Sequence, residues 1–152
     1  MSFAWKFGAC YQRYTAPLMR TASIGDPSPA TARLSNACLS ALANVLDAMR
    51  PGVTAHEVAQ AGWAGLDQAG PDLVFHGCFA YGVGAGFPPT WGDGTTRILL
   101  DNHTPLETGM VFHHPIALRQ LGECGAMFSE TTVITESGCE VLGNTPRELH
   151  FR

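Results

Sequence analysis

The chain has 152 residues, enough for one domain with a buried core, and 45% of them are apolar while 14% are charged. This composition excludes a disordered chain, and a net charge of −4 without a basic cluster argues against a nucleic-acid or membrane surface. Five cysteines without a CxxC pair are typical of reduced thiols, so we expect a cytoplasmic protein.

The first 70 residues predict a strand followed by two helices. Residues 4–21 read as one bent strand, in which Pro17 interrupts the pairing. Ser28 caps a helix that runs from Pro29 to about residue 49. The run Thr54-Ala55-His56-Glu57 is a capping box and opens a second helix that reaches about residue 69.

The rest of the chain predicts strands and turns. The expected strands cover about residues 74–84, 97–100, 109–117, 126–135 and 139–142. A strand, two helices and then an antiparallel sheet form an α+β domain.

Residues 81–93, YGVGAGFPPTWGD, combine a glycine-rich stretch with a Pro-Pro pair and Trp91. Glycine lets a backbone or a ligand approach where a Cβ would collide, and proline fixes φ. Taken alone, the segment predicts either the border of a pocket or a tight bend of a sheet without a ligand.

Four motifs together resemble the creatinase, prolidase and methionine aminopeptidase superfamily, whose domain is the pita-bread fold. They are residues 13–21, 81–93, 109–113 and 129–140. The second motif is similar to the ectoine-hydrolase-like branch, close to the Xaa-Pro peptidases. The resemblance implies a partial pita-bread fold with a curved antiparallel sheet. It also implies that residues 1–152 form a single catalytic domain that lacks the usual N-terminal portion, so that the chain starts at the second strand of a hairpin.

Metal-dependent members of this superfamily bind two divalent ions through two Asp, one His and two Glu side chains, and the ions activate a water. The resemblance puts these ligands near residues 5–8, at Pro17, at Tyr81, in the region of His113-His114, and at Ser129. None of the five positions keeps its ligand, although Glu130 follows the last one. We therefore expect no metal and no other cofactor.

The remaining polar groups favour metal-independent hydrolysis of a C–N bond in a small amino-acid-derived substrate. We expect His113 to exchange a proton, Glu130 to act as nucleophile or orienting carboxylate, and Tyr81 to donate a hydrogen bond. The side chains expected to contact the substrate are Trp91, His114 and Phe87.

Each of these residues also has a structural interpretation. His113 and Tyr81 can be satisfied core residues, Trp91 a lid over the core, and Glu130 a surface carboxylate. Arg20 is expected to form a buried structural pair.

Three functions stay open at this point. They are the metal-independent hydrolase, a truncated non-catalytic homologue that binds or assembles, and a metal-dependent Xaa-Pro peptidase. The expected partners are a small-molecule substrate and a second copy of the chain, because the sheet edge at residues 1–3 has no preceding strand to pair with. We expect neither nucleic acid nor a membrane as partner.

Overall fold

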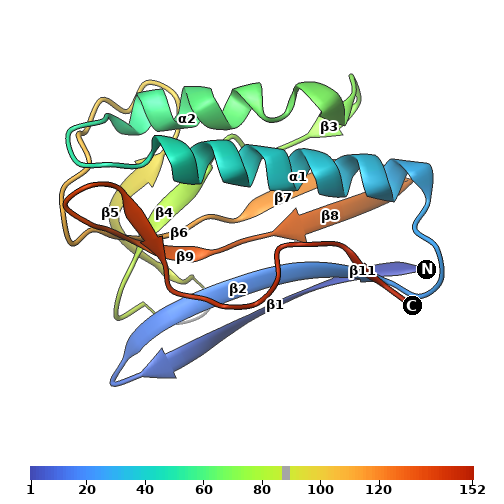
Figure 1. The fold of residues 1–152 in the computed structure, drawn as a ribbon, viewed down its shortest axis with the longest axis horizontal. Coiled ribbons are helices and arrows are strands. Elements are labelled where there is room, and N and C mark those ends of the chain that lie inside the picture. The colour runs from blue at the N-terminus through green and yellow to red at the C-terminus, as the bar shows by residue number, and fades with distance from the viewer. Residues whose placement is uncertain (87–89) are drawn as a thin grey trace.

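The structure is a computed structural model that describes residues 1–86 and 90–152. It has three layers, which Figure 1 shows from top to bottom. Helices α1 (Pro29–Ala48) and α2 (Ala55–Ala64) lie side by side over a middle layer of strands. A long hairpin of β1 (Ser2–Tyr11) and β2 (Tyr14–Ser23) lies below that layer.

The middle layer consists of two antiparallel groups of strands. The larger has the order β10-β9-β6-β4-β5, with bounds Cys139–Val141, Thr131–Ile134, Val111–His113, Ala80–Val83 and Gly92–Ile98. The smaller has the order β3-β7-β8, with bounds Leu73–Val74, Ile116–Gln120 and Cys124–Phe128. The two groups are separate sheets, and the chain joins them where β6 leads into β7 through His114-Pro115 and β8 into β9 through Ser129-Glu130.

Side-chain caps fix where the helices begin, as predicted. Ser28 Oγ accepts the Thr31 backbone N–H at 3.1 Å, and Pro29 occupies the first turn. At α2, the Thr54 side chain and Glu57 make both bonds of the capping box. This helix ends earlier than predicted, and a 3-10 turn at Asp67–Ala69 follows.

The prediction of one bent strand over residues 4–21 is wrong, and so is the prediction that the chain starts at the second strand of a hairpin. The structure has both hairpin strands, β1 and β2, paired along their whole length from Ser2↔Ser23 to Tyr11↔Tyr14. The turn between them uses positive φ angles of 47° at Gln12 and 71° at Arg13. Neither residue is a glycine or an asparagine, so the usual signature of such a turn is missing from the sequence.

Pro17 does not interrupt the pairing, because its nitrogen points away from β1. In an antiparallel strand, every second residue directs its N–H to the same side. Thr15 N–H donates to Gly84 O at 2.9 Å and Met19 N–H to Ser129 Oγ at 2.6 Å, both away from β1 and toward the middle layer. Pro17 lies between them with no N–H to satisfy, and it pairs with Gly8 of β1.

The third strand of the lower sheet is β11 (His150–Phe151), which pairs with β2 and brings the two termini to the same end of the molecule. The outer edge of β1 has no strand partner in the part of the chain that the structure describes. The expected dimer therefore stays a prediction.

The core fills the space between the helices and the middle layer. Its largest fully buried apolar side chains are Leu34, Leu42, Met49, Phe79, Ile98, Leu106, Phe112, Ile116, Leu118, Phe128 and Ile134. Burying one such side chain contributes about 1.5–3 kcal/mol. Among the described residues, no helix combines the length and the apolar character that a bilayer crossing needs.

Candidate functional site

Four side chains form a row across the middle layer, on the face that looks toward the hairpin. Tyr81 on β4 pairs with Arg97 on β5 and with His113 on β6, and His113 pairs with Thr131 on β9. Directly opposed residues of antiparallel strands project to the same face. Thr131 Oγ1 donates to Pro17 O of β2 at 2.9 Å, which shows that this face meets the hairpin.

A cavity of about 540 Å³ opens at one end of this row. The side chains that matter for its chemistry are Lys6, His76, Cys78, Tyr81, Trp91 and Arg97. Trp91 closes the cavity against β1, since a Cβ on Gly8 would lie 2.8 Å from its indole ring. Lys6 Nζ lies 6.0 Å from the centroid of the same ring, within the range of a cation–π contact.

His113 is the unpaired imidazole behind this cavity. Its ring packs edge-on against Tyr81 with 5.3 Å between the centroids, it is fully buried, and neither ring nitrogen has a hydrogen-bond partner. Burial, the neighbouring His114 and Lys6 lower the pKa of His113 to about 3. The imidazole is therefore neutral near pH 7 and has one unprotonated ring nitrogen, but this low pKa makes it a weak base that can hold a proton only transiently.

Tyr81 and Cys78 keep their protons, and His76 accepts a backbone hydrogen bond. Burial raises the pKa of Tyr81 to about 12, so its hydroxyl keeps its proton and can donate a hydrogen bond. Burial also raises the pKa of the Cys78 thiol, which donates to Ala80 O and is not activated as a nucleophile. His76 Nδ1 accepts the Cys78 backbone N–H at 3.1 Å.

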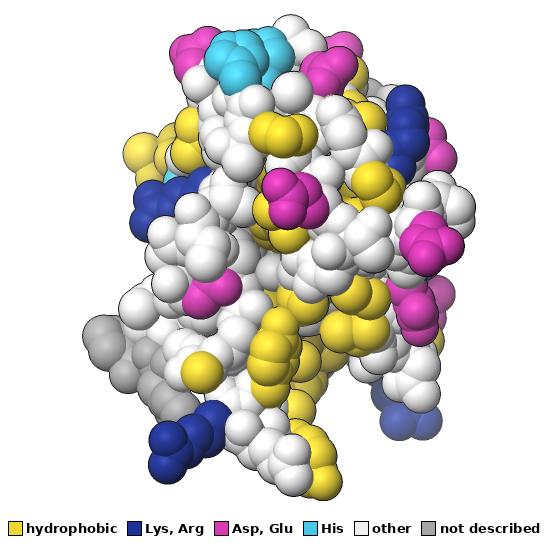
Figure 2. Space-filling model, turned by 90° about the vertical axis from the view of Figure 1, so that its left-hand side faces the viewer, with side chains coloured by type: hydrophobic (Ala, Val, Ile, Leu, Met, Phe, Trp, Pro, Cys, Tyr) yellow, Lys and Arg dark blue, Asp and Glu magenta, His cyan; other side chains and the backbone are white. Residues whose placement is uncertain are grey.

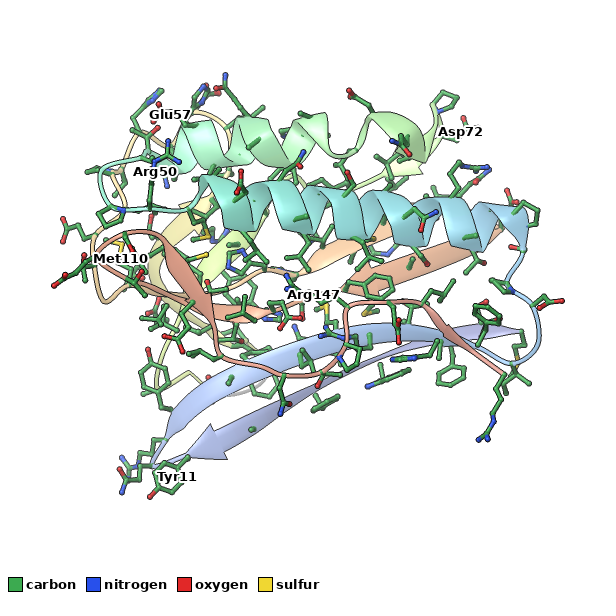
Figure 3. The ribbon with its side chains drawn as sticks, in the orientation of Figure 1. Tyr11, Arg50, Glu57, Asp72, Met110 and Arg147 are labelled. Carbon is green, nitrogen blue, oxygen red and sulfur yellow. The ribbon has the colours of Figure 1, made fainter. Side chains whose placement is uncertain are left out.

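Glu130 does not line this cavity. Its carboxylate accepts a bond from Arg20 at 2.6 Å, and both side chains are 1% exposed, as expected for Arg20. Burial raises the pKa of Glu130 while Arg20 pulls it down. Arg20 also donates to the carbonyls of Thr145 and Pro146, on the segment that carries Arg147 between α1 and β2 in Figure 3.

His114 points to the opposite face from His113. Its Nε2 lies 2.8 Å from Thr132 Oγ1, and its ring centroid lies 6.5 Å from that of the core residue Phe112. Of the six predicted site residues, the structure thus brings Tyr81, His113 and Trp91 together and places Glu130 and His114 elsewhere. Phe87 lies outside the described residues.

The donor set of this face does not fit the dinuclear metal centre that the resemblance implies. Between Lys6, Arg97, Tyr81 and His113 there are two cations, one phenol and one imidazole, and no carboxylate. A pair of divalent ions needs anionic oxygen ligands, and two fixed cations oppose their binding. At the last ligand position, Ser129 Oγ is occupied by Met19 N–H.

A separate group of metal-donor side chains lies at the surface, at the start of α2. Ligand atoms of His56, Asp101 and His103 all lie within 4.8 Å of one another, and Figure 2 shows histidine side chains gathered at this end of the molecule. His56 Nδ1 already accepts the Asp101 backbone N–H at 3.0 Å. Ala55 N–H donates to Thr104 O, so the fold brings together residues that show no ligand spacing in the sequence.

Lys6, His76, Cys78 and Arg97 are cavity residues that the sequence did not reveal. Lys6 is the only lysine in the chain, but its place in the cavity follows from its position on β1 of the hairpin. The positions of the other three depend on the register of β5 against β4 and on the course of the segment before β4, and no short sequence pattern predicts either.

The likeness to known proteins agrees with this fold. A model described as metallopeptidase family M24 matches residues 2–136. Ectoine hydrolase from Halomonas elongata is 35% identical over 148 residues, which are 97% of this chain and 37% of that protein. Xaa-Pro dipeptidase from Pyrococcus furiosus is 30% identical, over 93% of this chain and 39% of that protein.

Solved structures give the same result. Dipeptidase PepE from Mycobacterium ulcerans superimposes with a TM-score of 0.86 at 32% identity, over 99% of this chain and 39% of that one. X-Pro aminopeptidase from Thermotoga maritima has a TM-score of 0.86 at 25% identity, over 99% and 42%. The predicted pita-bread fold is confirmed, and the chain spans about two fifths of the length of these relatives. With most of its residues matched by the family model, the chain belongs to metallopeptidase family M24.

Proposed function

We propose that this chain carries the catalytic face of a hydrolase that cleaves a C–N bond in a small amino-acid-derived substrate, without a metal pair. The observation that carries the proposal is the contact between Tyr81 and the unpaired, neutral His113, beside a cavity closed by Trp91. Ectoine is the first candidate substrate, because ectoine hydrolase is among the relatives.

Each side chain has a role that its surroundings support. Tyr81 keeps its proton and donates a hydrogen bond to the polar group that gains charge during attack. His113 takes a proton from the attacking water through a bridging water and passes it to the leaving nitrogen, so that the C–N bond breaks after the C–O bond has formed. Trp91 forms the wall for the substrate ring. Glu130, held by Arg20, stabilises the bend between β8 and β9 and takes no part in the reaction.

Two other functions have their own support. The likeness to the Xaa-Pro dipeptidase of Pyrococcus furiosus favours a metal-dependent peptidase. The lack of a carboxylate among the described residues around the cavity favours a module that only binds.

Turnover of ectoine and of an Xaa-Pro dipeptide, followed by NMR after chelation and again with added Mn²⁺, separates these functions. We expect ectoine turnover that does not depend on metal and that falls at least ~100-fold in His113→Ala and in Tyr81→Phe, the range typical of general acid–base groups. His150→Ala, at the surface and outside the group of His56, Asp101 and His103, is the control. Turnover of the dipeptide with Mn²⁺ alone would establish the peptidase, and binding of ectoine without turnover would establish the binding module.

A further inference from the structure

The cavity carries a positive charge in an otherwise acidic protein. The chain has a net charge of −4, yet the charged side chains that line the cavity are Lys6 and Arg97. No Asp or Glu is among the described residues that line it. A cleft with charges of one sign concentrates ligands of the opposite sign, so this cleft favours an anion.

Neither cation is neutralised by the protein within the part of the chain that the structure describes. The ion pairs found there are Arg20–Glu130 and His150–Glu148, and neither involves Lys6 or Arg97. Lys6 is an exposed residue, but the protein atoms around its ammonium group lower its pKa by desolvation. An anion that enters the cavity would relieve the cost of this unpaired charge.

The two cations reach the cavity from different layers. Lys6 comes from β1 of the hairpin, while Arg97 comes from β5 of the middle layer and is the cross-strand neighbour of Tyr81. A ligand between them meets the Tyr81 hydroxyl and the Trp91 indole as well. The volume of about 540 Å³ suits a molecule of amino-acid size with part of its hydration.

Resting on the proposed function, which takes this cavity as the substrate site, we propose that Lys6 and Arg97 bind the carboxylate of the substrate and so select amino-acid derivatives that carry a free carboxylate. Arg97 offers a planar pair of donors that matches a carboxylate, and Lys6 adds a point charge. A phosphate shares the negative charge, but the described lining residues come from strands and loops and provide no helix N-terminus for a dianion.

Equilibrium binding of ectoine, of ectoine carboxamide and of inorganic phosphate tests the proposal on the whole chain. Ectoine should bind, and the carboxamide, which loses the carboxylate and keeps the cationic amidinium ring, should bind at least ~10-fold more weakly, as for the loss of a charge-assisted hydrogen bond. Lys6→Met and Arg97→Met should each weaken ectoine binding at least ~10-fold and should not weaken carboxamide binding. Arg50→Met, an exposed arginine at the end of α1, is the matched control and should bind as the wild type does.

Because Lys6 is the only lysine, its acylation by an N-hydroxysuccinimide ester can be followed by peptide mapping. Ectoine should slow the labelling of Lys6 at least ~10-fold if its carboxylate covers the amine, and the Met1 amine, which bonds Ile24 O, serves as internal control. Circular dichroism of the variants confirms that they fold.

The anion site would be overturned if ectoine and its carboxamide bound equally well, or if Lys6→Met and Arg97→Met bound ectoine as tightly as the wild type. It would also be overturned if the wild-type chain bound neither ectoine nor phosphate. If phosphate slows the labelling of Lys6 and ectoine does not, the site binds a phosphate group and the proposed carboxylate is wrong. Carboxylate binding that needs Lys6 and Arg97 but leads to no turnover would uphold the anion site and refute the hydrolase.

Discussion

Two neutral histidines, His113 and His114, should make the fold sensitive to mild acid. Both are fully buried, and burial is the largest cause that lowers the pKa of each to about 3. In the unfolded chain they return to the ordinary value of about 6.5. The unfolded state therefore takes up two protons below that pH while the folded state takes up none, so stability is present above about pH 6.5 and is lost as the pH falls toward 3.

The size of the effect follows from linkage. One pKa unit corresponds to about 1.4 kcal/mol, so at pH 5, about 1.5 units below the unfolded value, each histidine lowers the free energy of unfolding by about 2 kcal/mol. Together, His113 and His114 should lower it by about 4 kcal/mol between pH 7.5 and pH 5, a large share of the ~5–15 kcal/mol of a typical domain.

Urea unfolding followed by tryptophan fluorescence at several pH values measures this slope. His113→Gln and His114→Gln should each remove about half of it, and His103→Gln, at the surface, should leave it unchanged. These variants separate the imidazoles from Glu130, whose pKa burial raises. A free energy of unfolding that stays constant from pH 7.5 to pH 5, or Gln variants with the full slope, would refute the reasoning.

Three further changes test other contacts. Glu130→Gln should cost about 3–5 kcal/mol in urea unfolding, because it leaves the buried Arg20 charge without a counter-ion. Gly8→Ala should weaken ectoine binding and leave Tm nearly unchanged, because its Cβ would lie 2.8 Å from the Trp91 ring and would displace that wall of the cavity. Thr54→Ala should lower the free energy of unfolding by about 1 kcal/mol, because it removes the capping box of α2.

Matched variants control these measurements. Gly138→Ala adds a Cβ with no neighbour closer than 4.0 Å, so it should change neither Tm nor binding. Glu136→Gln, an exposed carboxylate on the same part of the chain, should be neutral in urea unfolding. A neutral Glu130→Gln would show that the Arg20 pair does not stabilise the bend, and a Gly8→Ala variant that binds normally would place Trp91 outside the site.

The helices were predictable because local chemistry specifies where they begin. The Ser28 cap and the Thr54 capping box fix the starts of both helices. The strands were predicted less well: residues 139–142 match β10, the predicted strands 74–84, 109–117 and 126–135 are each broken into two, and 97–100 covers only the end of β5. The hairpin turn was missed because Gln12 and Arg13 adopt positive φ without the residues that favour it.

The site was only partly predictable, because register and long-range pairing decide it. The contact of Tyr81 with His113 depends on the pairing of β4 with β6, and a shift of one residue would have turned either side chain to the other face. Glu130 finds its partner Arg20 at a separation of 110 residues. Arg97 is in the cavity because it pairs with Tyr81.

Anomalous diffraction from crystals grown with Mn²⁺ and ectoine would test the central claim most directly. We predict ectoine density against Trp91 with its carboxylate at Lys6 and Arg97, and no anomalous peak between Tyr81 and the hairpin. Two Mn²⁺ peaks on that face, bridged by a water and bound by side chains of this row, would contradict the account.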